Sequence, residues 1–202
     1  ALIDSLSDVG LSLMTLISVN WAMKPADDNH RHGHGKVEGI AALIQAMMLA
    51  GGGAFLVMEA FDRFIHPIKI TDHGFTLVMM GLSVVLSMGI AKVQKLGAHH
   101  SDSLAVEADS LHYSADILIN GAVFLVILFD YLGFFGTWMD PLSAIAVAAI
   151  MANTAYDIVL KAFGMLLDEE LPEDTRNKII AKIKSHSAVL GLHDLRTTKS
   201  GS

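Results

Sequence analysis

The sequence predicts an all-α polytopic membrane protein with five spanning helices, followed by the start of a small α+β cytoplasmic domain. Of its 202 residues, 52% are apolar and only 17% are charged, whereas soluble domains carry about 25% charged residues. Several segments approach the roughly 20 apolar residues that a helix needs to cross a bilayer. This pattern stops near residue 166. We therefore divide the chain into a transmembrane domain, residues 1–166, and the beginning of a cytoplasmic αβ domain, residues 167–202.

The five predicted spans differ in their ionisable content. The second and third contain no charge, whereas the first and fourth carry Asp or His inside an apolar segment. The fifth opens with Asp140-Pro141, which predicts an N-cap and a first-turn proline. Glycines in the second span and alanines in the fifth, among them Gly51, Gly53 and Ala148, would let helices approach closely. The spans cover residues 1–23, 39–58, 74–91, 110–129 and 140–165.

The orientation follows from the lysines and arginines of the short loops, which favour the cytoplasmic side. The loop after the first span holds Lys24, Arg31 and Lys36, and the loop after the third holds two more lysines. The other side holds Arg63 and a single lysine. This bias places the His-rich loop and the C-terminal domain in the cytoplasm. The chain would then enter the membrane from outside, which implies a preceding span.

Beyond residue 167 the pattern changes to that of a soluble domain. Residues 173–186 alternate charges with isoleucines, which predicts an amphipathic helix opened by Pro172. Residues 192–198 alternate like a half-buried strand. A helix followed by a strand indicates an α+β domain, most of which lies beyond this sequence.

Two pairs of ionisable residues lie inside the predicted spans. Asp4 and Asp8 are four residues apart, and His112 and Asp116 repeat this spacing. Residues four apart share one helix face. An unpaired aspartate at mid-membrane costs about 2.5–3.5 kcal/mol, so three would cost about 8–10 kcal/mol. Three oxygen ligands and one nitrogen ligand suit tetrahedral zinc and are tolerated by other divalent ions. We therefore predict a metal site shared by the two spans.

Two other interpretations of these pairs stay open. The side chains could line a hydrated cavity or hydrogen-bond neighbouring helices without metal. They could also belong to an intramembrane aspartyl protease, although the Gly-x-Gly-Asp motif is absent. Two pairs with matched spacing favour metal binding, because intramembrane ionisable groups are as a rule functional.

A second candidate site lies in the loop after the first span. Asp27, His30 and His34 form a compact Asp-x2-His-x3-His set of hard and borderline ligands. Three ligands on a short loop predict a weaker or exchanging metal site with an open position.

Composition excludes several other classes of function. The chain has no cysteine, which excludes disulfide frameworks, thiolate zinc sites and cysteine nucleophiles. Its net charge of −7 argues against nucleic-acid binding, which needs a basic surface. Any bound metal must therefore be held by oxygen and imidazole.

These motifs together resemble the cation diffusion facilitator family, specifically its bacterial zinc/proton antiporter branch, which exports ferrous iron and zinc. The two intramembrane pairs occur in order, with the histidine loop between them, over nearly the whole chain. The segments that carry the resemblance are residues 4–8, 25–30, 33–38, 107–113, 167–172 and 191–197.

The resemblance implies an inner-membrane homodimer with six spans and a cytoplasmic metal-binding αβ domain, so the first span and most of the last domain would lie outside this chain. It implies that His193 contributes to a metal site of the cytoplasmic domain. It also implies that Lys36 pairs with Asp168 at the dimer centre. The implied transport-site and loop-site residues are Asp4, Asp8, His112 and Asp116, and Asp27, His30 and His34.

The expected function is efflux of a divalent cation by alternating access, with zinc exchanged for protons at the intramembrane site. Zinc would be both transported and structural, and ferrous iron or cadmium is the alternative main ion. A membrane-anchored metal sensor or scaffold is a further alternative, but it would not need ligands inside the membrane. A metalloenzyme would need a catalytic base and a substrate pocket, which the sequence does not reveal, so we expect no enzymatic activity.

Overall fold

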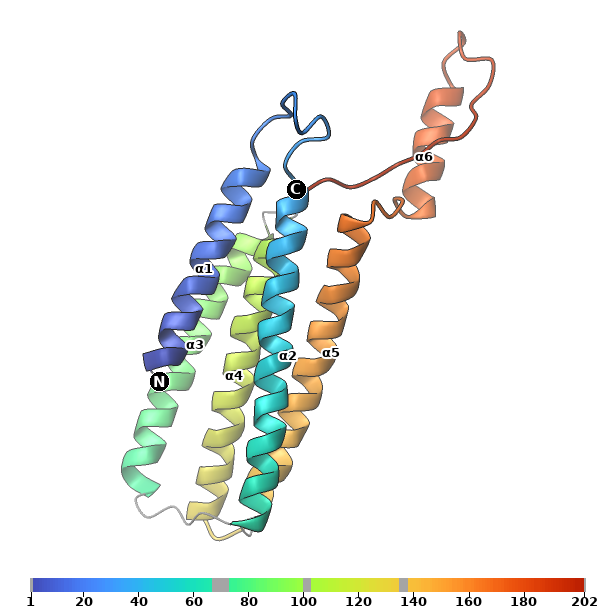
Figure 1. Cartoon of the computed structure of the whole chain (residues 1–202). Coiled ribbons are helices and arrows are strands. Elements are labelled where there is room, and N and C mark those ends of the chain that lie inside the picture. Colours follow the sequence, from blue (N-terminus) through green and yellow to red (C-terminus); the bar gives the residue numbers. More distant parts are fainter. Residues whose placement is uncertain (1, 67–72, 100–102, 135–137, 202) are drawn as a thin grey trace.

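The computed structural model describes residues 2–66, 73–99, 103–134 and 138–201, and no strand occurs among them. Four helices, α2 to α5, contain segments long and apolar enough to cross a membrane, and α1 adds the shorter apolar stretch Leu6–Ala22. The five predicted spans are therefore helical. The helices are α1 (Leu2–Ala22), α2 (Lys36–Ile65), α3 (His73–His99), α4 (Leu104–Tyr131), α5 (Met139–Leu166) and α6 (Glu173–Lys184) (Figure 1).

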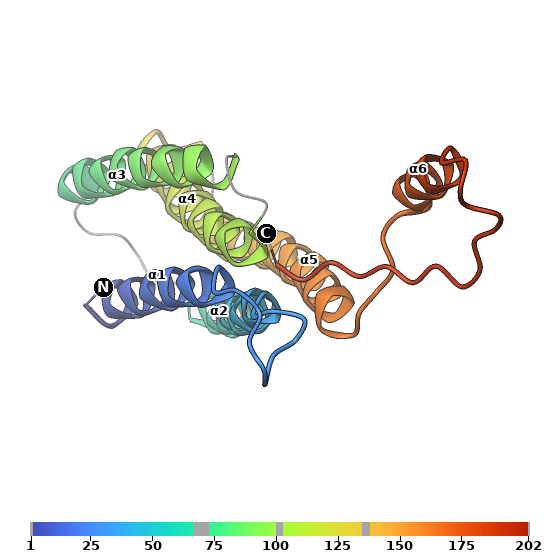
Figure 2. The same cartoon turned by 90° about the horizontal axis from the view of Figure 1, so that it is seen from above.

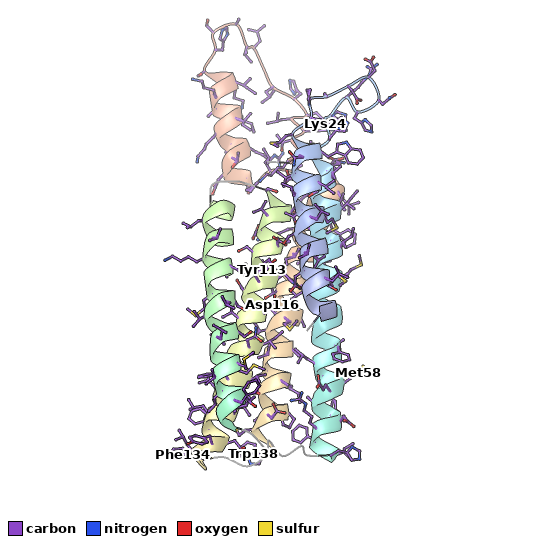
Figure 3. All side chains as sticks on the ribbon, turned by 90° about the vertical axis from the view of Figure 1, so that its left-hand side faces the viewer. Lys24, Met58, Tyr113, Asp116, Phe134 and Trp138 are labelled. Carbon is purple, nitrogen blue, oxygen red and sulfur yellow. The ribbon has the colours of Figure 1, made fainter. Side chains whose placement is uncertain are left out.

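The first five helices lie side by side in a bundle, while α6 stands apart beyond one end (Figure 1). That end, which we call the loop end, carries the loop between α1 and α2, the start of α4 and the end of α5. Seen along the bundle, α1 and α2 lie on one side and α3 and α4 on the other (Figure 2). Lys24 marks the loop end, and Phe134 and Trp138 mark the opposite end (Figure 3). Aromatic residues at this level are typical of a membrane interface.

The most extensive helix contact joins α2 to α5. On both helices the buried positions recur at alternating intervals of three and four residues, the spacing of a left-handed helix pair. Most of these side chains are small, so dispersion contacts between close backbones hold the pair together. They are Ala42, Ala46, Leu49, Gly53 and Ala60 on α2, and Ala148, Met151, Ala155, Ile158, Ala162 and Met165 on α5.

The glycines and alanines expected to permit close packing divide into two groups. Gly53 and Ala148 are buried against each other's helix, and a β-carbon on Gly53 would lie 3.5 Å from the Ala148 carbonyl oxygen. Gly51 is exposed and a β-carbon there would meet nothing within 4 Å. Only one face of α2 therefore requires small residues.

Helix α3 packs on α4 and keeps an apolar outer surface. Its described span, Gly74–Val93, has no buried residue, and side chains such as Phe75, Val78 and Leu82 are exposed. An apolar surface of this size suits contact with lipid chains rather than water.

The structure corrects the expected start of α5. The N-cap residue is Trp138, and Asp140 lies within the first turn. Its carboxylate accepts a 2.6 Å hydrogen bond from Arg63 Nη1, and Arg63 also pairs with Glu59 at 2.6 Å. Arg63 belongs to α2 rather than to a loop. The Asp140 carboxylate therefore pairs α5 with α2 instead of capping α5, because the Arg63 guanidinium lies within hydrogen-bond distance.

The structure also corrects the C-terminal segment. Residues 192–198, the predicted strand, form no strand, because the described part of the chain contains no second strand to pair with. The predicted helix is shorter than expected and ends at Lys184, with Pro172 preceding its first residue. The division at residues 166 and 167 into two domains stays a prediction.

Replacing Gly53 by Leu should destabilise the bundle, because the added side chain would overlap Ala148 and Met151. Overpacking of this kind costs about 1–3 kcal/mol. The matched control is Gly51→Leu, on the open face of the same helix. We expect thermal unfolding in detergent to occur at lower temperature for the first variant alone. Equal melting of both variants would show that α2 and α5 do not pack closely here.

Candidate metal-binding sites

The first cluster joins α1 to α4 in the middle of the bundle. Asp8 projects from α1, and His112 and Asp116 project from α4, which packs against it. The ligand atoms of these three residues all lie within 4.8 Å of one another. Asp116 lies about half-way between the two ends of the five-helix bundle, beside Tyr113 (Figure 3). The side chain of Asp4, the fourth expected ligand, lies outside the described part of the structure.

The separations within this intramembrane cluster fit a small divalent ion. His112 Nε2 lies 3.3 Å from Asp8 Oδ1 and 3.9 Å from Asp116 Oδ2. Zinc bonds of 2.0–2.2 Å imply a tetrahedron with edges of about 3.3–3.6 Å. One pair is therefore already at ligand spacing, and the other needs a closure of a few tenths of an ångström. Without a cation, His112 Nε2 is within hydrogen-bond distance of Asp8 and within ion-pair distance of Asp116.

A polar contact next to the cluster ties the same two helices together. Ser12 of α1 lies 3.1 Å from the Tyr113 hydroxyl of α4. The Tyr113 ring meets His112 edge-on at 6.1 Å between centroids. His112 Nδ1 is buried and has no hydrogen-bond partner in the described part of the chain. If Nε2 binds a cation, the proton of the neutral ring must stay on Nδ1.

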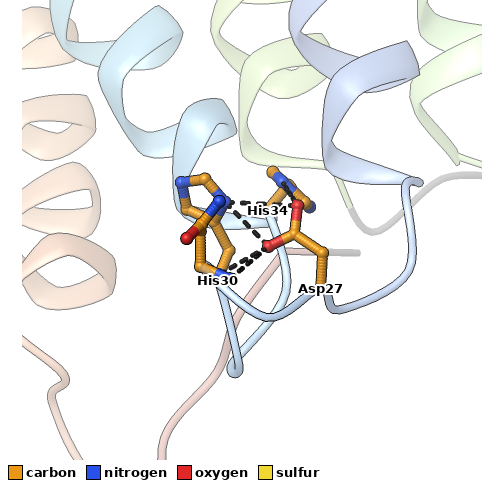
Figure 4. A network of polar contacts seen from close by, with 4 residues as sticks. Asp27, His30 and His34 are labelled. Carbon is orange, nitrogen blue, oxygen red and sulfur yellow. Dashed lines mark hydrogen bonds and ion pairs between the residues drawn. The ribbon is translucent and has the colours of Figure 1, made fainter.

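The second cluster lies at the loop end and is more exposed. Asp27 Oδ1 accepts hydrogen bonds from the backbone N–H groups of Asn29, at 2.9 Å, and His30, at 2.6 Å. His30 Nδ1 lies 3.1 Å from the same oxygen, and His34 Nε2 lies 3.4 Å from Asp27 Oδ2 (Figure 4). The two imidazole rings are 4.5 Å apart between centroids. Three ligands thus converge, and the loop backbone rather than a helix holds the central carboxylate.

The hydrogen bonds of the loop keep Asp27 ionised. The backbone N–H of His30 lowers the pKa of the Asp27 carboxyl group below its usual value, and the His30 side chain and Asn29 lower it further. A carboxylate that stays charged is ready to bind a cation.

A salt bridge joins the start of α2 to the end of α5. Lys36 Nζ lies 2.7 Å from Asp168 Oδ2 and also donates to the Leu166 carbonyl oxygen at 3.3 Å. Thr198 donates to the other oxygen of Asp168 at 2.8 Å. The Lys36 hydrogen bond, followed by that of Thr198, lowers the pKa of the Asp168 carboxyl group. Asp168 holds this position with a left-handed backbone, at φ 59°.

His193 belongs to neither cluster. It lies exposed in the coil after α6, and no other candidate ligand of the described residues joins it. Its contribution to a site of the cytoplasmic domain stays a prediction.

Sequence reasoning missed two buried carboxylates near these clusters. Glu38 is fully buried and Asp109 is 4% exposed. Asp109 lies three residues before His112, so the two share a face of α4, and Glu38 lies in the first turn of α2, four residues after the loop ligand His34. That spacing was the available signal. It was overlooked because each residue lies at the edge of an apolar segment rather than inside it.

Comparison with known proteins agrees with this architecture. Residues 1–167 match the model of the cation efflux transmembrane domain. The cation-efflux pump FieF of Shewanella oneidensis is 36% identical over 201 residues, covering 100% of this chain and 67% of that protein. FieF of Escherichia fergusonii is 37% identical over 201 residues, covering 100% and 66%. The chain spans about two thirds of the length of these relatives.

The family model matches residues 1–167, and both relatives are more than one-third identical to this chain over 201 residues. The chain belongs to the cation efflux family, the cation diffusion facilitators, which are membrane transporters and not enzymes.

Proposed function

We propose that this chain exports a divalent metal cation, with zinc as the main ion, in exchange for protons. Asp8, His112 and Asp116, together with Asp4, form the transport site. The observation that carries the proposal is the convergence of the first three ligands within 4.8 Å inside an apolar bundle. The relatives named as cation-efflux pumps support the direction of transport.

The donor set favours zinc among the common cations. Carboxylates alone suit magnesium, calcium or manganese, whereas an imidazole nitrogen favours zinc and its transition-metal neighbours. Ferrous iron accepts the same donors, and cadmium remains a second alternative. His112 is therefore the residue that restricts the range of ions.

Proton exchange follows from the charge of the site. Three carboxylates and one Zn²⁺ give a net charge near −1, whereas the site without metal would carry −3. Unpaired carboxylates are costly in a medium of low dielectric constant, so protons should replace the departing cation. Metal and protons compete for the same atoms, because each ligand must be deprotonated to bind the metal.

The remaining sites have supporting roles in this proposal. The loop cluster of Asp27, His30 and His34 binds a second zinc ion at the cytoplasmic entrance, and His193 contributes to a third site in the cytoplasmic domain. Lys36 and Asp168 lie where the spans meet that domain and at the centre of a homodimer. The lysine and arginine bias of the loops supports a cytoplasmic loop end in the bacterial inner membrane.

A membrane-anchored metal sensor is the competing function, and a flux assay distinguishes the two. The full-length protein in proteoliposomes should move zinc across the bilayer, with iron, manganese and cadmium tested in parallel. Metal binding without any flux would favour the sensor.

Asp8→Ala or Asp116→Ala should abolish zinc flux, because each removes a charged ligand from the intramembrane cluster. The fold should be retained, since a carboxylate inside the membrane is costly without metal. Ser114→Ala, at an exposed position on α4, the helix that carries Asp116, serves as control. Size-exclusion profiles should match for all variants. Normal flux in either aspartate variant would remove that residue from the transport site.

Replacing Asp27, His30 and His34 together by Ala should reduce the zinc flux without eliminating it. Asp27 and His30 are exposed, His34 is buried, and all three precede the start of α2, so their replacement removes none of the intramembrane ligands. Initial flux rates at several zinc concentrations measure the effect. Complete loss of flux would mean that the loop cluster is essential.

Zinc binding to the intramembrane cluster should weaken as the pH falls, because protons and the metal compete for the same ligand atoms. His112→Ala should reduce this pH dependence, because it removes one of the atoms for which they compete. The measurement is zinc titration of the loop triple variant, so that only the intramembrane cluster contributes. Constant affinity from about pH 5.5 to 7.5 would contradict proton exchange.

A further inference from the structure

The buried polar side chains of the described residues gather between the two metal clusters. On α1 they lie between Asp8 and the loop, and on α4 between the helix start and His112. On α2, Gln45 donates to Thr15 of α1 at 2.6 Å, at the same level. The set comprises Thr15, Ser18, His34, Glu38, Gln45, Ser103 and Asp109. The buried polar side chains of the described residues therefore lie in one stretch of an otherwise apolar bundle. Ionisable groups inside a membrane protein as a rule serve function.

Glu38 occupies a junction within this stretch. It lies in the first turn of α2, four residues after the loop ligand His34, and is fully buried. The backbone N–H of Leu104, the first residue of α4, donates to Glu38 Oε2 at 3.1 Å. A carboxylate at a helix N-terminus gains from both the hydrogen bond and the helix dipole. Glu38 therefore fastens the start of α4 to the start of α2.

The C-terminal tail packs on the same junction. A β-carbon on Gly201 would lie 2.8 Å from Gly35 Cα and 3.5 Å from Glu38 Oε1, and one on Gly35 would overlap the Ser200 carbonyl oxygen. Ser200 also donates to the His32 carbonyl oxygen at 3.2 Å. The loop, the start of α2 and the tail are thus closely packed around Glu38.

Helix α4 connects this junction to the intramembrane cluster. His112 and Asp116 follow Leu104 by eight and twelve residues on one uninterrupted helix. At 1.5 Å per residue, they lie about 12 Å and 18 Å from the fastened end. Any shift of the helix start relative to α2 would therefore move both ligands relative to Asp8 on α1.

We propose that Glu38 is a positioning residue that transmits metal occupancy of the loop cluster to the intramembrane cluster through α4. The inference rests on the proposed function, since it requires metal at both clusters. Metal on His34 fixes the loop and the start of α2, Glu38 fixes the start of α4, and α4 then holds His112 and Asp116 at ligand spacing.

The test is a double-mutant cycle on zinc affinity, using the full-length protein in detergent. Isothermal titration calorimetry with zinc gives the affinity of each cluster. The binding event that is lost in the Asp116→Ala variant belongs to the intramembrane cluster. With Glu38 present, the loop variant His30→Ala/His34→Ala should lower the affinity of the intramembrane cluster by about fivefold, the lower range of typical coupling between sites. With Glu38→Met, which keeps the length but has no acceptor oxygen, the loop variant should have no further effect.

Variants at Leu104 test the same contact without changing Glu38. Leu104→Pro removes the N–H donor, and proline is tolerated there because Leu104 is the first helical residue and Ser103 before it is already extended. Leu104→Ala removes the same buried side chain and keeps the donor. The proline variant should behave like Glu38→Met, whereas the alanine variant and Glu38→Gln, which retains an acceptor oxygen, should preserve the coupling.

The outcomes separate the inference from the proposed function. If the loop effect and the Glu38→Met effect simply add, Glu38 is only structural and the inference is wrong. The inference also fails if Leu104→Pro and Leu104→Ala give the same coupling. If the unsubstituted protein binds no zinc at the intramembrane cluster, the proposed function itself fails.

Discussion

The cost of placing carboxylates inside an apolar bundle governs this structure. In the middle of a membrane, bulk water does not solvate the carboxylates of Asp8 and Asp116. They therefore require a cation, a proton or the imidazole of His112. The cluster lies between two helices rather than within one. Its energy therefore depends on how closely α1 and α4 approach each other. A bound cation and the packing of these helices stabilise the same arrangement.

The two kinds of helix contact in the bundle have different physical origins. The pair α2 and α5 is joined by regularly spaced small apolar side chains along most of its length. The contact of α1 with α4 is smaller and includes polar groups such as Ser12 and Tyr113. Packed apolar surfaces have few alternative arrangements, whereas hydrogen bonds and ligands can change partners. This contrast suits a fixed scaffold that supports a site with two states.

Local patterns in the sequence predicted the spanning helices and the grouping of the candidate ligands. Spacing within one helix brought His112 near Asp116, and the short loop brought His30 and His34 near Asp27, because these relations need only local geometry. Partners far apart in the chain were harder to predict. Arg63 was assigned to a loop because the uncharged apolar segment ends at residue 58, and its partner Asp140 lies 77 residues away. The contact of Glu38 with Leu104 spans 66 residues, and the strand expected at residues 192–198 depends on pairing that no local pattern supplies.

The left-handed backbone at Asp168 has a consequence for the end of α5. A glycine would adopt this φ without steric cost, and helices often end with one. Asp168 instead accepts hydrogen bonds from Lys36 and Thr198, which a glycine could not. Local conformational preference and long-range pairing are thus in conflict at a single residue, a case of local frustration. Loosening of the Lys36 contact would leave the backbone strain uncompensated, so this turn is a natural place for the chain to change direction.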